Sequence, residues 1–143
     1  MLEGCGLAYC AHPVNLLAGG QLKPEFLKIL PNNKIPAIVD TEGPGGRAYA
    51  LFESGAILTY LAEKSGRFLP KRGRARFEVL EWLSFQMANI GPMFGQAHNF
   101  RKFGLERLPY AIERYTKEAN RLYGVLNKRL RGRSYICGTP PPI

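Results

Sequence analysis

The hydrophobic pattern of the sequence changes character near Phe68-Leu69-Pro70. Before this point, short apolar stretches alternate with turns rich in proline and glycine, which is typical of a small unit built from strands and short helices. After it, apolar residues recur every three to four positions along two long segments, which is typical of amphipathic helices. The pattern therefore predicts an α/β domain over residues 1–70 and an α-helical domain over residues 71–143.

The first part carries signals for several short elements. Apolar, β-branched runs indicate strands, while proline and glycine mark the ends of helices and turns. The strands on either side of the Gly43–Gly46 loop are close enough in sequence to form an antiparallel hairpin. In chain order, we predict a strand that runs into a loop over 7–17, a short helix over 24–29, a buried strand over 37–39, a strand over 49–52, and a helix that starts at Glu53-Ser54 and ends at Gly66. Either Glu53 or Ser54 could cap this helix, and Ser54 is the better N-cap type.

Two long helices account for most of the second part. The first is predicted over Arg76–Ile90, and Gly91-Pro92 should break or kink it because proline lacks a backbone N–H. The second is predicted over Tyr110–Leu130. The apolar stripes that should face a core comprise Phe77, Leu80, Leu83/Ser84, Met87 and Ile90 on the first helix, and Ile112, Tyr115, Ala119, Leu122, Leu126 and Leu130 on the second.

The chain is basic, with 20 Lys and Arg against 11 Asp and Glu and a formal net charge of +9. Such a charge fits a nucleic acid, an acidic membrane surface or an anionic small molecule as partner. However, the basic runs at 71–76 and 128–133 fall at a linker and at a helix C-terminus, where cations are common and favourable. No aromatic side chains are interleaved with these runs. We therefore expect neither nucleic acid nor a membrane as a partner.

Cysteine and histidine content limits the chemistry further. Three cysteines are too few and too odd in number for a disulfide framework, which favours a reducing, cytoplasmic setting. Cys5 and Cys10 do not have the spacing of a redox pair, and two histidines are too few for a credible metal site. No secretory signal pattern opens the sequence, and no apolar run approaches the roughly 20 residues that span a bilayer.

The segment from Asn33 to Val39, Asn-Lys-Ile-Pro-Ala-Ile-Val, is the first informative motif. Pro36 directly precedes a predicted strand, removes one backbone donor and restricts Ile35 to an extended conformation. If the Ile35–Pro36 bond is cis, the backbone N–H and C=O of Ile35 turn outward and can pair with an extended peptide. Taken alone, the motif favours the ordinary trans start of a strand, because cis is the minority form of such bonds.

The second motif is Glu53-Ser54-Gly55 at the start of a predicted helix. Backbone amides and a hydroxyl at a helix N-terminus form a site for a carboxylate. The carboxylate of Glu53 beside them can pair with an ammonium group, so that together they can hold the two charged groups of an amino acid. Taken alone, a simple helix cap is the favoured alternative.

Together, the motifs resemble half of a thioredoxin-like layout, and four separated phrases resemble the cytosolic glutathione transferases in the order of that family. They read PVNLLAGGQLKPEFLKILPNNKIPAIVD and LFESGAILTYLAEKSGRFLP, then EWLSFQMANIGPMFGQAHNF and YAIERYTKEANRLYGVLNKRL. The phrases are most similar to the nu class, some members of which reduce disulfides of glutathione. The resemblance implies a thioredoxin-like domain followed by a helical domain, and glutathione as co-substrate for thiol transfer to a small-molecule electrophile or for reduction of a disulfide.

The resemblance also implies roles for individual residues. The backbone of Ile35, before a cis Pro36, would pair with the cysteinyl part of glutathione, while Glu53 and Ser54 would hold the γ-glutamyl end. Gln21 matches a loop position that contacts glutathione, although a solvated loop residue is an equal alternative. Arg114 matches an arginine that reaches the ligand, with a charge on a solvated helix face as its alternative. The full set of candidate glutathione-binding residues is Gln21, Asn33, Lys34, Ile35, Pro36, Glu53, Ser54 and Arg114, of which Asn33 and Lys34 are the weaker members.

The sequence also departs from the family pattern. Residues 1–7 match the tail of the family's first helix, so we expect the first strand and the residue that activates the glutathione sulfur to be missing, and we assign no catalytic residue. The segment after Gly138 does not match the family's later helices, so we expect the helical domain to be incomplete. A homodimer is expected where the full fold is present. The alternative is a non-catalytic interaction module of the same fold, or a truncated relic.

Overall fold

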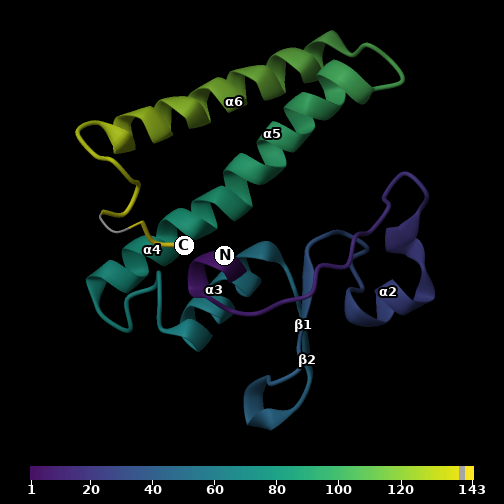
Figure 1. The fold of residues 1–143 in the computed structure, drawn as a ribbon. Coiled ribbons are helices and arrows are strands. Elements are labelled where there is room, and N and C mark those ends of the chain that lie inside the picture. The colour runs from purple at the N-terminus through teal and green to yellow at the C-terminus, as the bar shows by residue number, and fades with distance from the viewer. Residues whose placement is uncertain (139–140) are drawn as a thin grey trace. The chain divides into compact units, whose positions relative to one another are not determined.

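A computed structural model describes residues 1–138 and 141–143 (Figure 1). The chain forms two compact units, Met1–Arg67 and Phe68–Ile143. The second unit begins at Phe68, where the hydrophobic pattern changes character. None of the helices in the described residues is both long enough and apolar enough to cross a membrane.

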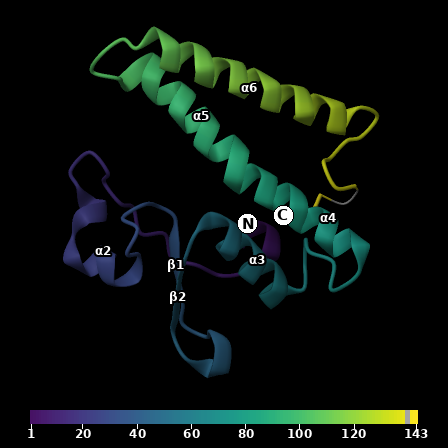
Figure 2. The ribbon, with the colours of Figure 1, turned by 180° about the vertical axis from the view of Figure 1, so that it is seen from behind.

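The first unit contains a two-stranded antiparallel sheet and short helices (Figure 2). The hairpin pairs Ala37 with Phe52 and Asp40 with Tyr49, which confirms the predicted hairpin. The predicted short helix over 24–29 is also confirmed, with Pro24 in its first turn. The elements are α1 (Leu2–Cys5), η1 (Gly20–Leu22), α2 (Pro24–Ile29), β1 (Ala37–Asp40), η2 (Pro44–Gly46), β2 (Tyr49–Phe52) and α3 (Ser54–Ser65).

Helix α3 supplies much of the apolar core of the first unit. Its residues Ile57, Leu61 and Ala62 are buried, and so is Leu30 at the end of α2. The helix ends at Gly66, whose φ of 66° is left-handed, as predicted. Of the two predicted cap residues, Glu53 occupies the cap position, and Ser54, the better N-cap type, is already the first helical residue. The reason is the backbone of Glu53, whose φ of 67° and ψ of 112° lie outside the helical region.

Two strand predictions for the first unit need correction. Residues 7–17 form no strand, because β1 and β2 pair only with each other in the described chain and leave this extended segment without a partner. The strand at 37–39 is present but is not buried, since Val39 remains 50% exposed. A two-stranded sheet buries a side chain only where a helix or loop covers it, so an apolar run alone did not establish burial.

The second unit is helical. Its elements are α4 (Arg74–Phe85), a π-helical turn η3 (Gln86–Ile90), α5 (Gly91–His98), a second π-helical turn η4 (Asn99–Phe103) and α6 (Pro109–Leu130). Of the two predicted effects of Gly91-Pro92, a break or a kink, the break is wrong, because helical backbone continues from η3 into α5. The N–H of Gly91 bonds to the carbonyl of Gln86, five residues back, so the wider turn places Pro92 in the first turn of α5. Proline is tolerated there because its missing N–H is not needed.

Helices α5 and α6 lie side by side in the second unit (Figure 1). Phe94 packs against Tyr123 with ring centroids 4.8 Å apart, and Phe100 stacks on Tyr115 at 5.4 Å. Leu122, from the predicted stripe of the second helix, is fully buried. Each predicted stripe is wrong at an apolar position, because Phe77 of the first helix is 70% exposed and Leu130 of the second is 38% exposed.

Arg129 ties the end of α6 to α4. Its guanidinium pairs with the carboxylate of Glu78 and lies 5.0 Å from the ring centroid of Trp82. Its Nε also donates to the carbonyl of Ile136 at 2.7 Å. The Arg129 guanidinium lowers the pKa of Glu78 below its ordinary value. One side chain therefore joins two helices and the segment that follows them.

Candidate functional site

The pairing register brings the two motifs of the first unit to the same end of the hairpin. Ala37 pairs with Phe52, so the residue before Ala37 and the residue after Phe52 leave the sheet together. Pro36 and Glu53 are these residues. The turn before β1 and the start of α3 therefore lie beside each other, as the sequence-based hypothesis of one shared site requires.

The Ile35–Pro36 peptide bond is cis. The trans form that the motif alone favours is therefore wrong, and the cis form that the family resemblance implies is confirmed. The side chain of Ile35 is 52% exposed, and Asn33 and Lys34 before it are also exposed. This turn lies on the surface, where its backbone is accessible to an extended ligand.

The start of α3 forms the second wall of the site. The first bond of the helix runs from the N–H of Ile57 to the carbonyl of Glu53 at 2.9 Å. The amides of Gly55 and Ala56 precede this bond, and amides in the first turn of a helix have no partner within the helix. These amides lie at the positive end of the helix dipole, where a carboxylate is stabilised. Ser54 is half-buried and Glu53 is exposed beside them.

A direct hydrogen bond connects the two walls. Asn32 Nδ2 donates to Glu53 Oε1 at 3.2 Å. Asn32 was missed by the sequence analysis, because Pro-Asn-Asn is an ordinary turn sequence and either asparagine fits it. No sequence signal separated Asn32 from Asn33, so only the fold identifies the residue that faces Glu53.

Gln21 lies in η1, which contacts α2. Its Oε1 is buried, and within the described chain it is the buried side-chain polar atom that has no hydrogen-bond partner. Leaving such an oxygen unsatisfied costs about 1–3 kcal/mol. This position contradicts the alternative reading of Gln21 as a solvated loop residue.

Arg114 is the candidate that lies in the second unit. It is exposed on α6 and lines a groove of about 630 Å³ together with Met93, Tyr110 and Glu118. The bond from Arg121 lowers the pKa of Glu118, and the charge of Arg114 contributes to the same effect. Arg114 therefore lies on an accessible, charged surface of the helical unit.

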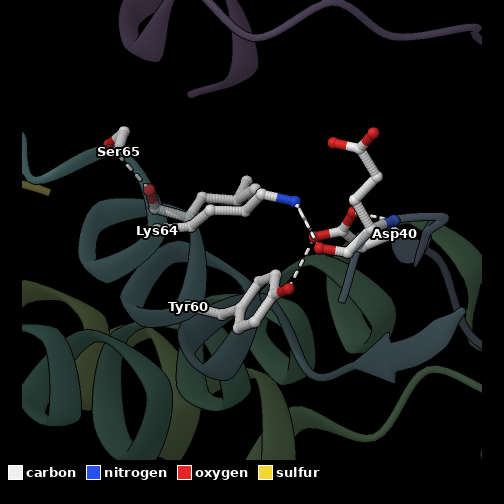
Figure 3. Close-up of polar contacts among 6 residues, drawn as sticks. Asp40, Tyr60, Lys64 and Ser65 are labelled. Carbon is white, nitrogen blue, oxygen red and sulfur yellow. Dashed lines mark hydrogen bonds and ion pairs between the residues drawn. The ribbon is translucent and has the colours of Figure 1, made fainter. Parts of the chain in front are cut away.

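A polar cluster fixes α3 at the opposite end of the hairpin (Figure 3). The side chains of Tyr60 and Lys64 each contact Asp40 Oδ2 at 2.5 Å. These two bonds lower the pKa of Asp40 from 3.8 to about 2, and the bond to Asp40 raises the pKa of Tyr60 to about 12. The Lys64 Nζ also donates to the carbonyl of Glu42 at 3.0 Å. The cluster anchors the helix whose other end forms the site.

The described residues contain no cluster of three or more His, Cys, Asp or Glu side chains that could hold a metal ion. The three cysteines, all within the described chain, are free thiols. Cys5 is buried, where Ser65 Oγ donates to its Sγ at 3.2 Å.

Comparison with known proteins identifies the fold. Residues 1–64 match the model of the glutathione S-transferase N-terminal domain. The chain is 53% identical over 138 residues to the disulfide-bond oxidoreductase YfcG of Escherichia coli K12, covering 96% of this chain and 64% of YfcG.

Solved structures give the same result. A glutathione transferase family member from Pseudomonas fluorescens, with two glutathione bound, is 52% identical, has a TM-score of 0.96, and is matched over 99% of this chain and 63% of its own. A glutathione transferase homolog from Lodderomyces elongisporus, with two glutathione per subunit, is 33% identical, has a TM-score of 0.89, and is matched over 99% of this chain and 69% of its own. The present chain thus spans a little under two thirds of the first two proteins. It belongs to the glutathione transferase family, with a thioredoxin-like N-terminal unit followed by a helical unit of that family.

Proposed function

We propose that this chain binds glutathione through its first unit and uses it as a co-substrate. The main support for this proposal is the pairing register of the hairpin, which brings the cis Ile35–Pro36 turn beside the start of α3. An exposed backbone edge next to a helix N-terminus offers one peptide-binding wall and one carboxylate-binding wall. The glutathione found in structures of similar chains supports this choice of ligand.

In the proposed complex, each part of glutathione meets a group of matching chemistry. The backbone N–H and C=O of Ile35 pair with the cysteinyl residue in the manner of an added strand. The γ-glutamyl carboxylate is held by the Ser54 hydroxyl and the amides at the start of α3, and the γ-glutamyl ammonium is held by Glu53.

The remaining candidates play smaller parts in this proposal. Gln21, in η1, contacts the ligand through its half-buried side chain. Asn33 and Lys34 lie in the exposed turn before Ile35 and contribute polarity and positive charge toward an anionic ligand. Arg114 contributes charge from the helical unit.

The chemistry that we propose is that of the glutathione thiolate. With an electrophile, the sulfur forms a new bond to carbon and the leaving group departs with the electron pair. With a disulfide, the thiolate attacks one sulfur, a mixed disulfide forms, and the other sulfur leaves as a thiolate that takes up a proton. A similar chain from Pseudomonas putida binds glutathione disulfide, and YfcG is named a disulfide-bond oxidoreductase, so we favour the disulfide branch. No residue of this chain is assigned as the group that activates the sulfur.

We also propose a homodimer that acts in the cytoplasm. Phe77 of α4 is 70% exposed, and the proposed dimer contact would remove this aromatic side chain from water. The three free thiols suit a reducing compartment. The alternative of a non-catalytic interaction module rests on the same exposed aromatic side chain and predicts no turnover.

Calorimetric titration of the purified chain with reduced and then oxidised glutathione tests the binding proposal. Glu53→Ala and Ser54→Ala should each weaken binding by about 10-fold, since each removes a hydrogen bond to a charged group of the ligand. Lys28→Ala, an exposed residue of α2 outside the site, is the control and should bind as the unaltered chain does. A folded chain that binds neither form of glutathione would contradict the proposal.

A further inference from the structure

We propose that Asn32 is a positioning residue for Glu53: its side-chain amide holds one oxygen of the Glu53 carboxylate so that the other oxygen faces an ammonium group of the ligand. This inference rests on the proposed function, because the ammonium is taken to be that of the γ-glutamyl group. It adds a residue that does not itself contact the ligand.

The hydrogen bond is the first observation behind this inference. Asn32 Nδ2 lies 3.2 Å from Glu53 Oε1, and the two residues are 21 positions apart in the sequence. An ionised carboxylate has about four acceptor positions, so one bond to Oε1 leaves the second oxygen with its full accepting capacity. The bond is exposed, so it adds little to stability, but it restricts the rotation of an otherwise mobile side chain.

The backbone gives an independent observation. Among the described residues other than glycine, positive φ occurs at Asn33 (45°), Glu53 (67°) and Phe68 (67°). Two of these three residues flank or form the Asn32–Glu53 contact. Residues held in sparsely populated backbone regions are energetically unfavourable and cluster at ligand sites. Asparagine tolerates a backbone with positive φ well, but glutamate does not. The conformation of Glu53 is therefore stronger evidence for a ligand site than that of Asn33.

The Glu53 conformation also has a clear geometric result. Glu53 directly follows Phe52, the last residue of β2, and caps α3, since its carbonyl accepts from Ile57 N–H at 2.9 Å. The backbone turns sharply at this point, and the side chain leaves toward the turn that holds Asn32. Among the described residues, the Glu53 carboxylate makes no capping hydrogen bond to the start of α3. Glu53 can therefore supply the negative charge that an ammonium needs while the first-turn amides receive a carboxylate.

The consequence is selectivity for a ligand that carries both charges. A carboxylate alone would bind at the start of α3 without help from Asn32. An α-amino acid end needs the anion of Glu53 in one fixed place, and Asn32 fixes it. Asn32 should therefore matter for glutathione but not for the analogue that lacks the α-amino group of its glutamyl residue.

The test is calorimetric titration of four chains with both ligands: the unaltered chain, Asn32→Ala, Glu53→Ala and the double variant. Asn32→Ala should weaken glutathione binding by about 3- to 10-fold, the value of one hydrogen bond, and should change binding of the analogue by less than about 2-fold. In the Glu53→Ala background, removal of Asn32 should change glutathione binding by less than about 2-fold, because the residue acts through Glu53.

Asn120→Ala is the matched control, since it makes the same change at an exposed position of α6. It should leave both affinities unaltered, and the thermal midpoint of Asn32→Ala should stay within a few degrees of that of the unaltered chain. If Asn32 has a merely structural role, Asn32→Ala will weaken the binding of both ligands equally, and the same loss will appear in the Glu53→Ala background. That result overturns the inference. Binding that responds to Glu53→Ala but not to Asn32→Ala overturns the positioning role alone. An unaltered chain that binds no glutathione overturns the proposed function, and the role of Asn32 with it.

Discussion

Replacement of Asp40 by asparagine tests whether the cluster at the far end of the hairpin holds α3 in place. Asp40 accepts from Lys64 and Tyr60 at 2.5 Å each, and its side chain is only 13% exposed. These bonds lower its pKa from 3.8 to about 2. A pKa difference of one between the folded and unfolded states corresponds to about 1.36 kcal/mol, so the lowered pKa of Asp40 corresponds to about 2.4 kcal/mol of stability at pH 7. Lys64 is 30% exposed, so solvent screening reduces the expected loss for Asp40→Asn to about 1–2 kcal/mol.

The pH dependence gives the sign of the effect. A carboxyl group whose pKa is lower in the folded state stabilises the fold when it is ionised, and this contribution disappears as the pH falls through the folded pKa. For Asp40, it is complete above about pH 5, about half remains at pH 3, and almost none remains below pH 2. The deficit of Asp40→Asn should therefore shrink on acidification.

Urea unfolding at pH 7 and at pH 3 measures both quantities. Glu42→Gln is the matched control, because it makes the same change of charge two residues away on an exposed side chain. It should cost less than about 0.5 kcal/mol at both pH values. Equal losses for the two variants, or a deficit of Asp40→Asn that does not change between pH 7 and pH 3, would refute the reasoning.

Three further variants test other parts of the fold. Leu122→Ala should cost about 2–5 kcal/mol in urea unfolding because Leu122 is fully buried, whereas Leu105→Ala, at a fully exposed position, should cost less than about 0.5 kcal/mol. Gly20→Ala should lower the thermal midpoint, because its new Cβ would lie 2.9 Å from the backbone oxygen of Asn15; an unchanged midpoint would contradict this contact. The phenol of Tyr60 should ionise near pH 12, and Tyr60→Phe should remove this transition from the ultraviolet pH titration. In the unaltered chain, the stability that this phenol contributes should be lost between pH 10 and 12. A phenol of Tyr60 that titrates at pH 10 would show that its bond to Asp40 is not formed.

Local sequence signals predicted the elements that depend on local chemistry. The turn residues between β1 and β2 fix an antiparallel hairpin, and Gly66 ends α3 because a left-handed residue is needed there. The two motifs of the site were found separately, and the family resemblance joined them. Their proximity follows from the pairing of Ala37 with Phe52, which the sequence alone does not reveal.

The errors came from features that depend on the rest of the fold. Residues 7–17 have the composition of a strand, but a strand needs a neighbour to pair with. Gly91-Pro92 is a strong break signal, yet a π-helical turn shifts the hydrogen-bond register so that the helix continues. Asn32 was missed because the choice between two adjacent asparagines depends on which one faces Glu53.

The central claim is that glutathione binds where the cis Ile35–Pro36 turn meets the start of α3. Amide NMR spectra of the chain, recorded while reduced glutathione is added, test this claim most directly. We predict that the largest shifts occur at Ile35, Gly55 and Ala56, and that Glu53→Ala reduces them. Shifts confined to the helices of the second unit, or the absence of any shift in a folded chain at millimolar glutathione, would contradict the account.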